Sequence, residues 1–244
     1  MVFAEIGTTI DKFRRARRVA GLLLFSGLAL AGPHRPALAD MSLSQVIVDL
    51  GPDQPPRDDI EVGNTGRERL YVVVEPAEIV SPGQPDEHRE QRRDPEQLGL
   101  LATPNRLILE PGQRKLVRIV ALAPRGERDR IYRVVIKPVV GELAAQQSAL
   151  KILVGYDVLV IVRPKKPIDG VTGARSGRTL TIRNAGNTNA EIFEGRQCDE
   201  TGKNCAELQA KRLYAGASWE QILPRDAPAS YTVRIQGQAT VRRF

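Results

Sequence analysis

The chain has 244 residues, with 36 Lys and Arg against 29 Asp and Glu and a formal net charge of +7. Two His and two Cys are too few for a His-ligated zinc site, a His-driven triad or a Cys-rich cluster, so we expect no enzyme, no metal and no cofactor. Low aromatic content with scattered Gly and Pro favours strands and turns over helical bundles.

The first 39 residues have the layout of an export signal. A basic stretch, FRRARR, precedes the apolar run VAGLLLFSGLALAG and then PHRPALAD. The apolar run is short for a hydrocarbon core of roughly 30 Å, although a retained anchor is the alternative. We expect cleavage after Ala39, by an export route that the sequence does not decide, and a mature protein in the periplasm.

The remaining chain is nearly balanced in charge. From Asp40 onward it carries 30 basic and 27 acidic residues, which argues against nucleic-acid binding. No later segment reaches 18 apolar residues without a charge, so we expect no stable membrane insertion.

Residues 40–164 read as a first domain. Seven strand-like runs lie there, separated by turn signals such as NTGRER and SPGQPD, and no long amphipathic helix interrupts them. This pattern is typical of an antiparallel β-sandwich of immunoglobulin type. The runs are QVIVDL, DDIEVGN, RLYVVVEPAEIV, NRLILEPG, KLVRIVAL, IYRVVIKPV and ALKILVGYDVLVIVRP.

The last of these runs, residues 149–163, is unusually long for a strand. Alternation places Leu150, Ile152 and Val154 on one continuous apolar face, which continues to Val162. The second half is apolar on both faces and predicts enclosure, whereas the first half presents one apolar row with less cover. That row is either part of a long core strand or a surface that a partner covers; a dimer of this chain is one such cover.

Residues 165–244 read as a second, smaller β-domain after the hinge PKKPIDG. Cys198 and Cys205 flank the turn-rich hexapeptide DETGKN, which brings two strand ends close together. In an exported protein this spacing predicts a disulfide.

Three segments in order resemble the periplasmic chaperones of the chaperone–usher pilus pathway. They are LLATPNRLILEPGQRKLVRIV, then ERDRIYRVVIKPV, then the long strand ending in Arg163 and Pro164. The resemblance implies two immunoglobulin-like domains in an L-shaped arrangement. It also implies a chaperone that lends its long strand to pilin subunits, whose own folds lack a strand, and delivers them to an outer-membrane usher.

Under this resemblance the lent side chains are Leu150, Ile152 and Val154. The resemblance also implies a structural ion pair between Asp129 and Arg163. The family anchors the subunit's terminal carboxylate with an Arg and a Lys, but the matching positions here are Gln45 and Leu159. Another basic residue such as Lys137 or Arg183, or a different anchor, would then be needed. The missing cations leave one alternative function, an exported immunoglobulin-like binding module for another envelope or surface assembly, without an usher.

Overall fold

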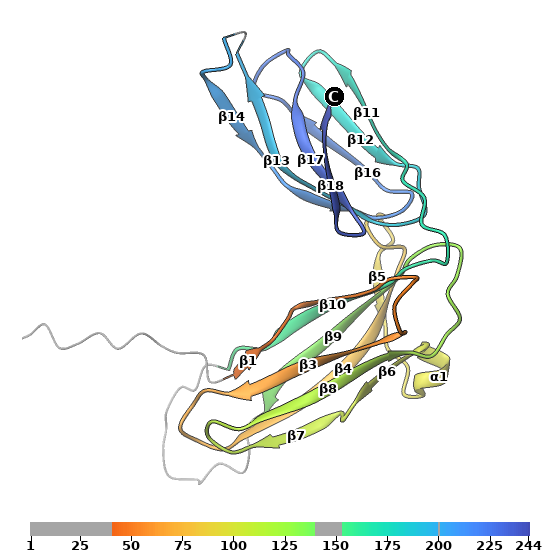
Figure 1. The fold of residues 1–244 in the computed structure, drawn as a ribbon, viewed down its shortest axis with the longest axis vertical. Helices are drawn as coiled ribbons and strands as arrows, with labels where there is room; N and C mark the ends of the chain where they lie inside the picture. Colours follow the sequence, from red (N-terminus) through yellow and green to blue (C-terminus); the bar gives the residue numbers. More distant parts are fainter. Residues whose placement is uncertain (1–40, 140–152, 200) are drawn as a thin grey trace, which may run out of the picture. The chain divides into compact units, whose positions relative to one another are not determined.

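A computed structural model describes residues 41–139, 153–199 and 201–244. Nearly all regular structure in this part of the chain is β-strand, and its strands form four sheets (Figure 1). Two sheets come from residues 41–162 and two from residues 171–243, and each pair encloses its own apolar core. The predicted class, all-β with two immunoglobulin-like sandwiches, is confirmed.

The first sandwich packs a four-stranded sheet against a six-stranded one. In order, the smaller sheet holds β1 (Met41–Leu43), β3 (Arg57–Asn64), β8 (Arg114–Ala121) and β6 (Leu100–Thr103). The larger holds β2 (Ile47–Leu50), β10 (Tyr156–Val162), β9 (Arg130–Val139), β4 (Leu70–Val80) and β5 (His88–Glu90), with β7 (Arg106–Leu109) also paired to β4. Every pair is antiparallel except β2 with β10, which is parallel.

Alternation along these strands builds the core. On β8, Val117 and Ile119 are fully buried, whereas Leu116 and Arg118 face outward. The two inner faces meet in one cluster that also contains Tyr132, whose hydroxyl donates to the Leu98 carbonyl at 3.3 Å. The buried phenol therefore keeps a polar partner inside an otherwise apolar layer.

The second sandwich is smaller. One sheet orders β11 (Val171–Ser176), β12 (Thr179–Asn184) and β16 (Ser218–Ile222); the other orders β14 (Cys205–Leu208), β13 (Ala190–Cys198), β17 (Ser230–Ile235) and β18 (Gln238–Arg243), with β15 (Lys211–Leu213) on β13. Its core centres on fully buried Tyr231, which packs edge-on against Trp219.

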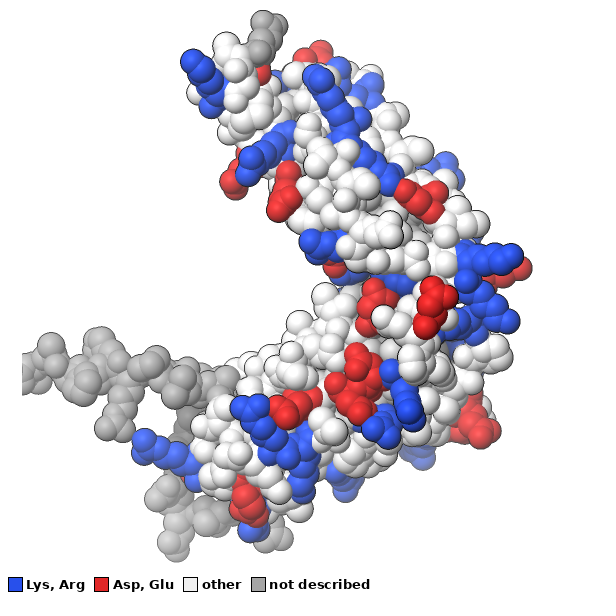
Figure 2. All heavy atoms as spheres, in the orientation of Figure 1, with Lys and Arg blue, Asp and Glu red and all other residues white. Residues whose placement is uncertain are grey.

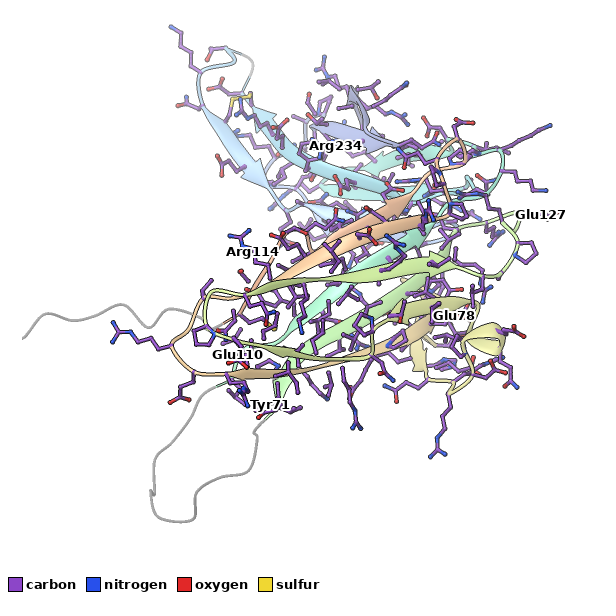
Figure 3. The ribbon with its side chains drawn as sticks, turned by 60° about the horizontal axis from the view of Figure 1, so that its bottom comes forward. Tyr71, Glu78, Glu110, Arg114, Glu127 and Arg234 are labelled. Carbon is purple, nitrogen blue, oxygen red and sulfur yellow. A yellow bond between two sulfur atoms is a disulfide. The ribbon has the colours of Figure 1, made fainter. Side chains whose placement is uncertain are left out.

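One short helix, α1 (Pro95–Leu98), lies in the charged stretch between β5 and β6. The Asp94 side chain caps it by accepting from the Glu96 N–H at 2.9 Å, and Gly99 ends it in the left-handed conformation. Arg130 joins α1 to β4, because its guanidinium donates to both Glu78 and the Leu98 carbonyl. Figure 3 labels Glu78 beside this helix.

Charged side chains of both signs are interspersed on the face shown in Figure 2. Many of them pair across neighbouring strands, as Arg118 does with Asp59 at 2.8 Å. Among the described residues, no helix has the length and hydropathy that a membrane crossing requires, and no three His, Cys, Asp or Glu side chains gather as a metal site would need.

Candidate functional site: the open edge of strand β10

The second half of β10 is enclosed on both faces. Val158, Val160 and Val162 are at most 3% exposed and belong to the first core. On the opposite face, Leu159 and Ile161 pack with Ile79 and Ile131 in a separate apolar cluster. Tyr214 of the second sandwich contacts this cluster. The predicted enclosure of this half is therefore observed, and the second sandwich supplies part of the cover.

The first half of β10 is open along one edge. Strand β2 pairs only with Leu159–Val162, and in the described part of the chain no strand lies beside Tyr156–Val158 on that side. The N–H groups of Leu159 and Arg163 donate toward β2, to Val46 and Leu50. Because alternate residues of a strand turn to the same edge, the Asp157 N–H points to this open side. The edge is thus a place where an added strand could pair.

Apolar side chains surround this edge. Val154, two residues before β10, is 53% exposed, and Val46 on the β2 side is 50% exposed. The apolar row that is buried from Val158 onward therefore reaches solvent at Val154. Of the three predicted donor residues, Leu150 and Ile152 lie outside the described residues.

The long strand expected over residues 149–163 needs correction in its described part. Strand β10 begins at Tyr156, and residues 153–155 carry no strand assignment. The chain still runs close to β9 there, since a Cβ added at Gly155 would lie 2.8 Å from Lys137 Cβ. With pairing available only on the β9 side, the ladder that defines a strand is not continued before Tyr156.

Arg163, directly after β10, lies in a buried polar junction and is only 4% exposed. Its Nε and Nη2 atoms donate to the two carboxylate oxygens of Asp49, each at 2.7 Å. Its Nη1 atom contacts the Thr188 hydroxyl of the second sandwich. The predicted partner, Asp129, is therefore not the carboxylate in direct contact with Arg163.

Asp129 joins the same junction through Thr188. Its carboxylate accepts from the Thr188 hydroxyl at 2.9 Å, and from the Asn189 N–H and side-chain amide at 2.6 Å each. Burial raises the pKa of Asp129, while these hydrogen bonds and the charge of Arg163 oppose that rise. Two carboxylates thus meet one buried arginine, one directly and one through a hydroxyl.

The protein resembles fimbrial chaperones in sequence, although no family model matches it. A CS1 fimbrial subunit of Escherichia coli is 27% identical over 175 residues, which cover 66% of this chain and 72% of that protein. The probable fimbrial chaperone EcpE of Escherichia coli (strain K12) is 29% identical over 151 residues. That match covers 57% of this chain and 59% of EcpE, which is less than two thirds of it.

Solved structures agree in fold. The class 5 fimbriae chaperone CfaA matches with a TM-score of 0.63 at 18% identity, over 83% of this chain and 98% of CfaA. The SafB chaperone of Salmonella enterica, solved in complex with the SafA pilin, belongs to a structure that matches with a TM-score of 0.57 at 17% identity, over 85% of this chain and 96% of that one. This chain has the fold of a fimbrial chaperone. The resemblance read from its motifs is confirmed.

In this chaperone fold, neither doubtful anchor position carries a cation. The Gln45 side-chain amide donates to the Asp58 carboxylate at 3.0 Å and to the Asp59 carbonyl at 3.2 Å. Leu159 is 4% exposed and belongs to the apolar cluster under Tyr214. Of the two basic alternatives, Lys137 packs beside Gly155 near the open edge and pairs with Glu75 at 2.9 Å. Arg183 lies elsewhere, in the second sandwich.

The chaperone fold also contains the expected disulfide between Cys198 and Cys205. It closes the hairpin of β13 and β14, whose last register pair is these two cysteines. Within the hairpin turn, Asp199 accepts from Thr201 and Asn204, and these hydrogen bonds hold its pKa down to about 2. The turn residues that predicted the disulfide thus also order the loop.

Sequence reasoning missed two residues of the junction, Asp49 and Thr188. Asp49 lies in β2, 114 residues before Arg163, and reaches it only because β2 pairs in parallel with β10. No local pattern announces that contact. Thr188 follows an NAGN turn, and its hydroxyl has no feature in the sequence that distinguishes it from a surface threonine.

Proposed function

We propose that this protein is an exported chaperone of the periplasm that binds pilin subunits. It would lend the segment before and at the start of β10 to a subunit whose fold lacks a strand. The observation that carries the proposal is the open edge at Tyr156–Val158, with Val154 exposed at the end of a buried apolar row. The fold supports it, as do SafB, solved with a pilin, and a further neighbour described as a chaperone–tip adhesin complex.

The physical basis is addition of a strand. Backbone N–H and C=O groups along the edge would pair with the subunit and set its register. Leu150, Ile152 and Val154 would fill the groove that the missing strand leaves. Burial of three such side chains is worth roughly 5 to 8 kcal/mol before entropy losses. This binding needs no nucleotide and no catalysis, because the chaperone supplies structure that the subunit lacks.

Release would follow when another subunit's strand replaces the lent one at an outer-membrane usher. Until then, a dimer in which two copies cover each other's strand rows would protect the apolar residues. Both steps follow from the same open edge, because an exposed apolar strand row favours whichever partner completes it.

Lys137 is our proposed anchor for the subunit's terminal carboxylate. It packs beside Gly155, and its ammonium group, 44% exposed at the side chain, shares the solvated surface with Glu75. A carboxylate arriving at the open edge would compete with Glu75 for this cation. Replacement of Lys137 by Gln should therefore weaken subunit capture without unfolding the chaperone.

Export with cleavage after Ala39 is part of this proposal. The chaperone must meet subunits where they emerge, on the far side of the inner membrane. The test is N-terminal sequencing of protein recovered from the periplasm, which should begin at Asp40. A chain that begins at Met1 in that fraction would contradict the predicted processing.

The decisive experiment measures capture of a pilin subunit from the same organism after co-expression in the periplasm. Leu150→Asp and Val154→Asp should each reduce recovered complex at least about tenfold, because a carboxylate cannot enter an apolar groove without large cost. Ile222→Asp is the matched control, because Ile222 is 63% exposed on the second sandwich. It should leave capture unchanged.

Equal capture by all three variants would remove the lent-strand mechanism. If the wild-type protein captures no subunit and purifies instead with a sugar or lipid, the alternative of an exported binding module for another envelope assembly would replace the chaperone. The missing cations at Gln45 and Leu159 are the observation that keeps this alternative specific.

A further inference from the structure

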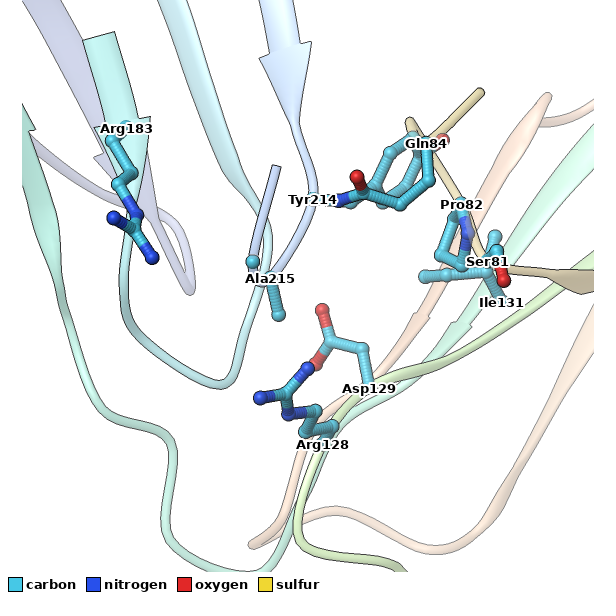
Figure 4. Close-up of a pocket in the computed structure, with 10 residues that line it drawn as sticks. Ser81, Pro82, Gln84, Arg128, Asp129, Ile131, Arg183, Tyr214 and Ala215 are labelled. Carbon is cyan, nitrogen blue, oxygen red and sulfur yellow. The ribbon is translucent and has the colours of Figure 1, made fainter. Parts of the chain in front are cut away.

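A cavity of about 490 Å³ lies away from the open edge, where loops of the two sandwiches meet. The turn after β4 contributes Ser81 and Gln84, the loop before β9 contributes Arg128 and Asp129, and β12 contributes Arg183. Tyr214 lies on a further side (Figure 4). The volume is in the range of small-molecule sites, which hold a few polar groups in a concave setting.

Two arginines from different sandwiches line this cavity. Neither Arg128 nor Arg183 forms an ion pair in the described residues, although other arginines nearby do, such as Arg163 with Asp49. Arg128 reaches the loop of the second sandwich, since a Cβ added at Gly216 would lie 3.5 Å from its Nη1 atom. Two like charges around one hollow repel each other unless an anion lies between them.

The carboxylate of Asp129 does not fill that role. Its oxygens already accept three hydrogen bonds from Thr188 and Asn189. Burial also raises its pKa, which disfavours the negative charge that would neutralise the arginines. The side-chain amide of Gln84 adds a donor on the opposite wall, beside Tyr214 in Figure 4.

We propose that this cavity binds a small oxyanion, phosphate or carboxylate, between Arg128 and Arg183. Guanidinium groups bind such oxygens with charge-assisted, often bidentate hydrogen bonds, so two of them make a selective site. Because one arginine comes from each sandwich, the bound anion links the first sandwich to the second. The site is separate from the open edge of β10 and does not depend on pilin binding.

The test is thermal unfolding of the purified protein in sodium phosphate against sodium chloride at equal ionic strength. Saturating phosphate should raise Tm by about 2 to 4 °C, because a ligand bound to the folded state alone stabilises it. Arg128→Gln and Arg183→Gln should each weaken phosphate binding about tenfold and abolish most of this shift. Arg106→Gln and Arg243→Gln change exposed cations elsewhere and should keep it.

A second measurement works on the unmodified protein. Phosphate should protect Arg128 and Arg183 from a guanidinium-modifying reagent while Arg106 and Arg243 react at unchanged rates. Equal Tm shifts in all four variants, or no protection of Arg128 and Arg183, would overturn the site. A peptide with a free terminal carboxylate and its amidated twin distinguish the source of the oxyanion. Protection by the free-carboxylate peptide alone would assign the site to a polypeptide end, and protection by phosphate to a free anion.

Discussion

The two halves of β10 differ in what surrounds them, although their sequences are similarly apolar. From Leu159 to Val162 the strand has β2 on one edge, β9 on the other and apolar layers on both faces. From Tyr156 to Val158 it keeps β9 but lacks a strand on the other edge. The difference teaches that one strand can serve as a core element and a binding element, with the boundary set by where its neighbour begins.

The largest expected effect is a charge in the closed half. Val160→Asp places a carboxylate where the wild-type side chain is fully buried. It should lower the free energy of unfolding by about 4 kcal/mol or more, because no cation faces that position in the described core. Val154→Asp, at a 53% exposed position, should change it by less than about 0.5 kcal/mol. Urea denaturation of both variants measures this contrast, and similar losses would break the comparison.

Arg163→Met tests the closed end of the strand. Removal of the guanidinium leaves Asp49 and Thr188 without their buried partner, at an expected cost of about 2 kcal/mol of unfolding free energy. Arg118→Met is the matched control, because Arg118 makes an equally regular pair with Asp59 on the exposed surface. Its cost should be less than about 1 kcal/mol by denaturant titration. Equal losses would show that burial of the junction adds nothing.

Gly155→Val sharpens the comparison at the open half. The added Cβ would lie 2.8 Å from Lys137 Cβ, so the chain before β10 must move away from β9. We expect a loss of about 1.5 kcal/mol, together with faster amide hydrogen exchange at Tyr156 and Asp157. Gly126→Val controls for the change itself, since its added Cβ has only ordinary contacts at 3.6 Å. Exchange confined to the closed half would contradict this expectation.

The smallest effect is a pH dependence from Asp129. Its pKa is raised in the folded protein, so the native state holds this proton above pH 3.8, where the unfolded chain has lost it. The contribution of Asp129 is therefore most favourable below pH 3.8 and declines as pH rises toward its raised pKa. Asp129→Asn should remove that decline, so its stability relative to wild type should improve from about pH 4 to about pH 7. A pH-independent difference in urea titrations would contradict the assignment.

Much of the fold could be predicted because the signals are local. Alternation and turn residues located β2, β3, β4, β7, β8 and β9 in the first sandwich, and the paired cysteines located the β13–β14 hairpin. The strands that escaped prediction are short or polar, such as β1 with three residues and β11 with the sequence VTGARS. Such segments become strands because a neighbour offers a ladder, and a neighbour is not visible in a local window.

The candidate site was only partly predictable for the same reason. The apolar row ending at Val154 is visible as alternation, so the sequence alone indicates a surface in need of cover. The end of that cover, at Leu159, depends on how far β2 runs beside β10. The acid that holds Arg163 depends on the same parallel pairing, and a resemblance between motifs pointed to Asp129 instead of Asp49.

The Tyr156 hydroxyl, at the first residue of β10, donates to the Met41 carbonyl at 3.0 Å. This bond places the beginning of the described chain beside the edge where a partner strand would attach. A purification tag fused just upstream of Met41 would therefore emerge at the docking edge and compete with the client. A tag after Phe244, whose backbone is bonded to Ala229 in the second sandwich, would begin away from that edge.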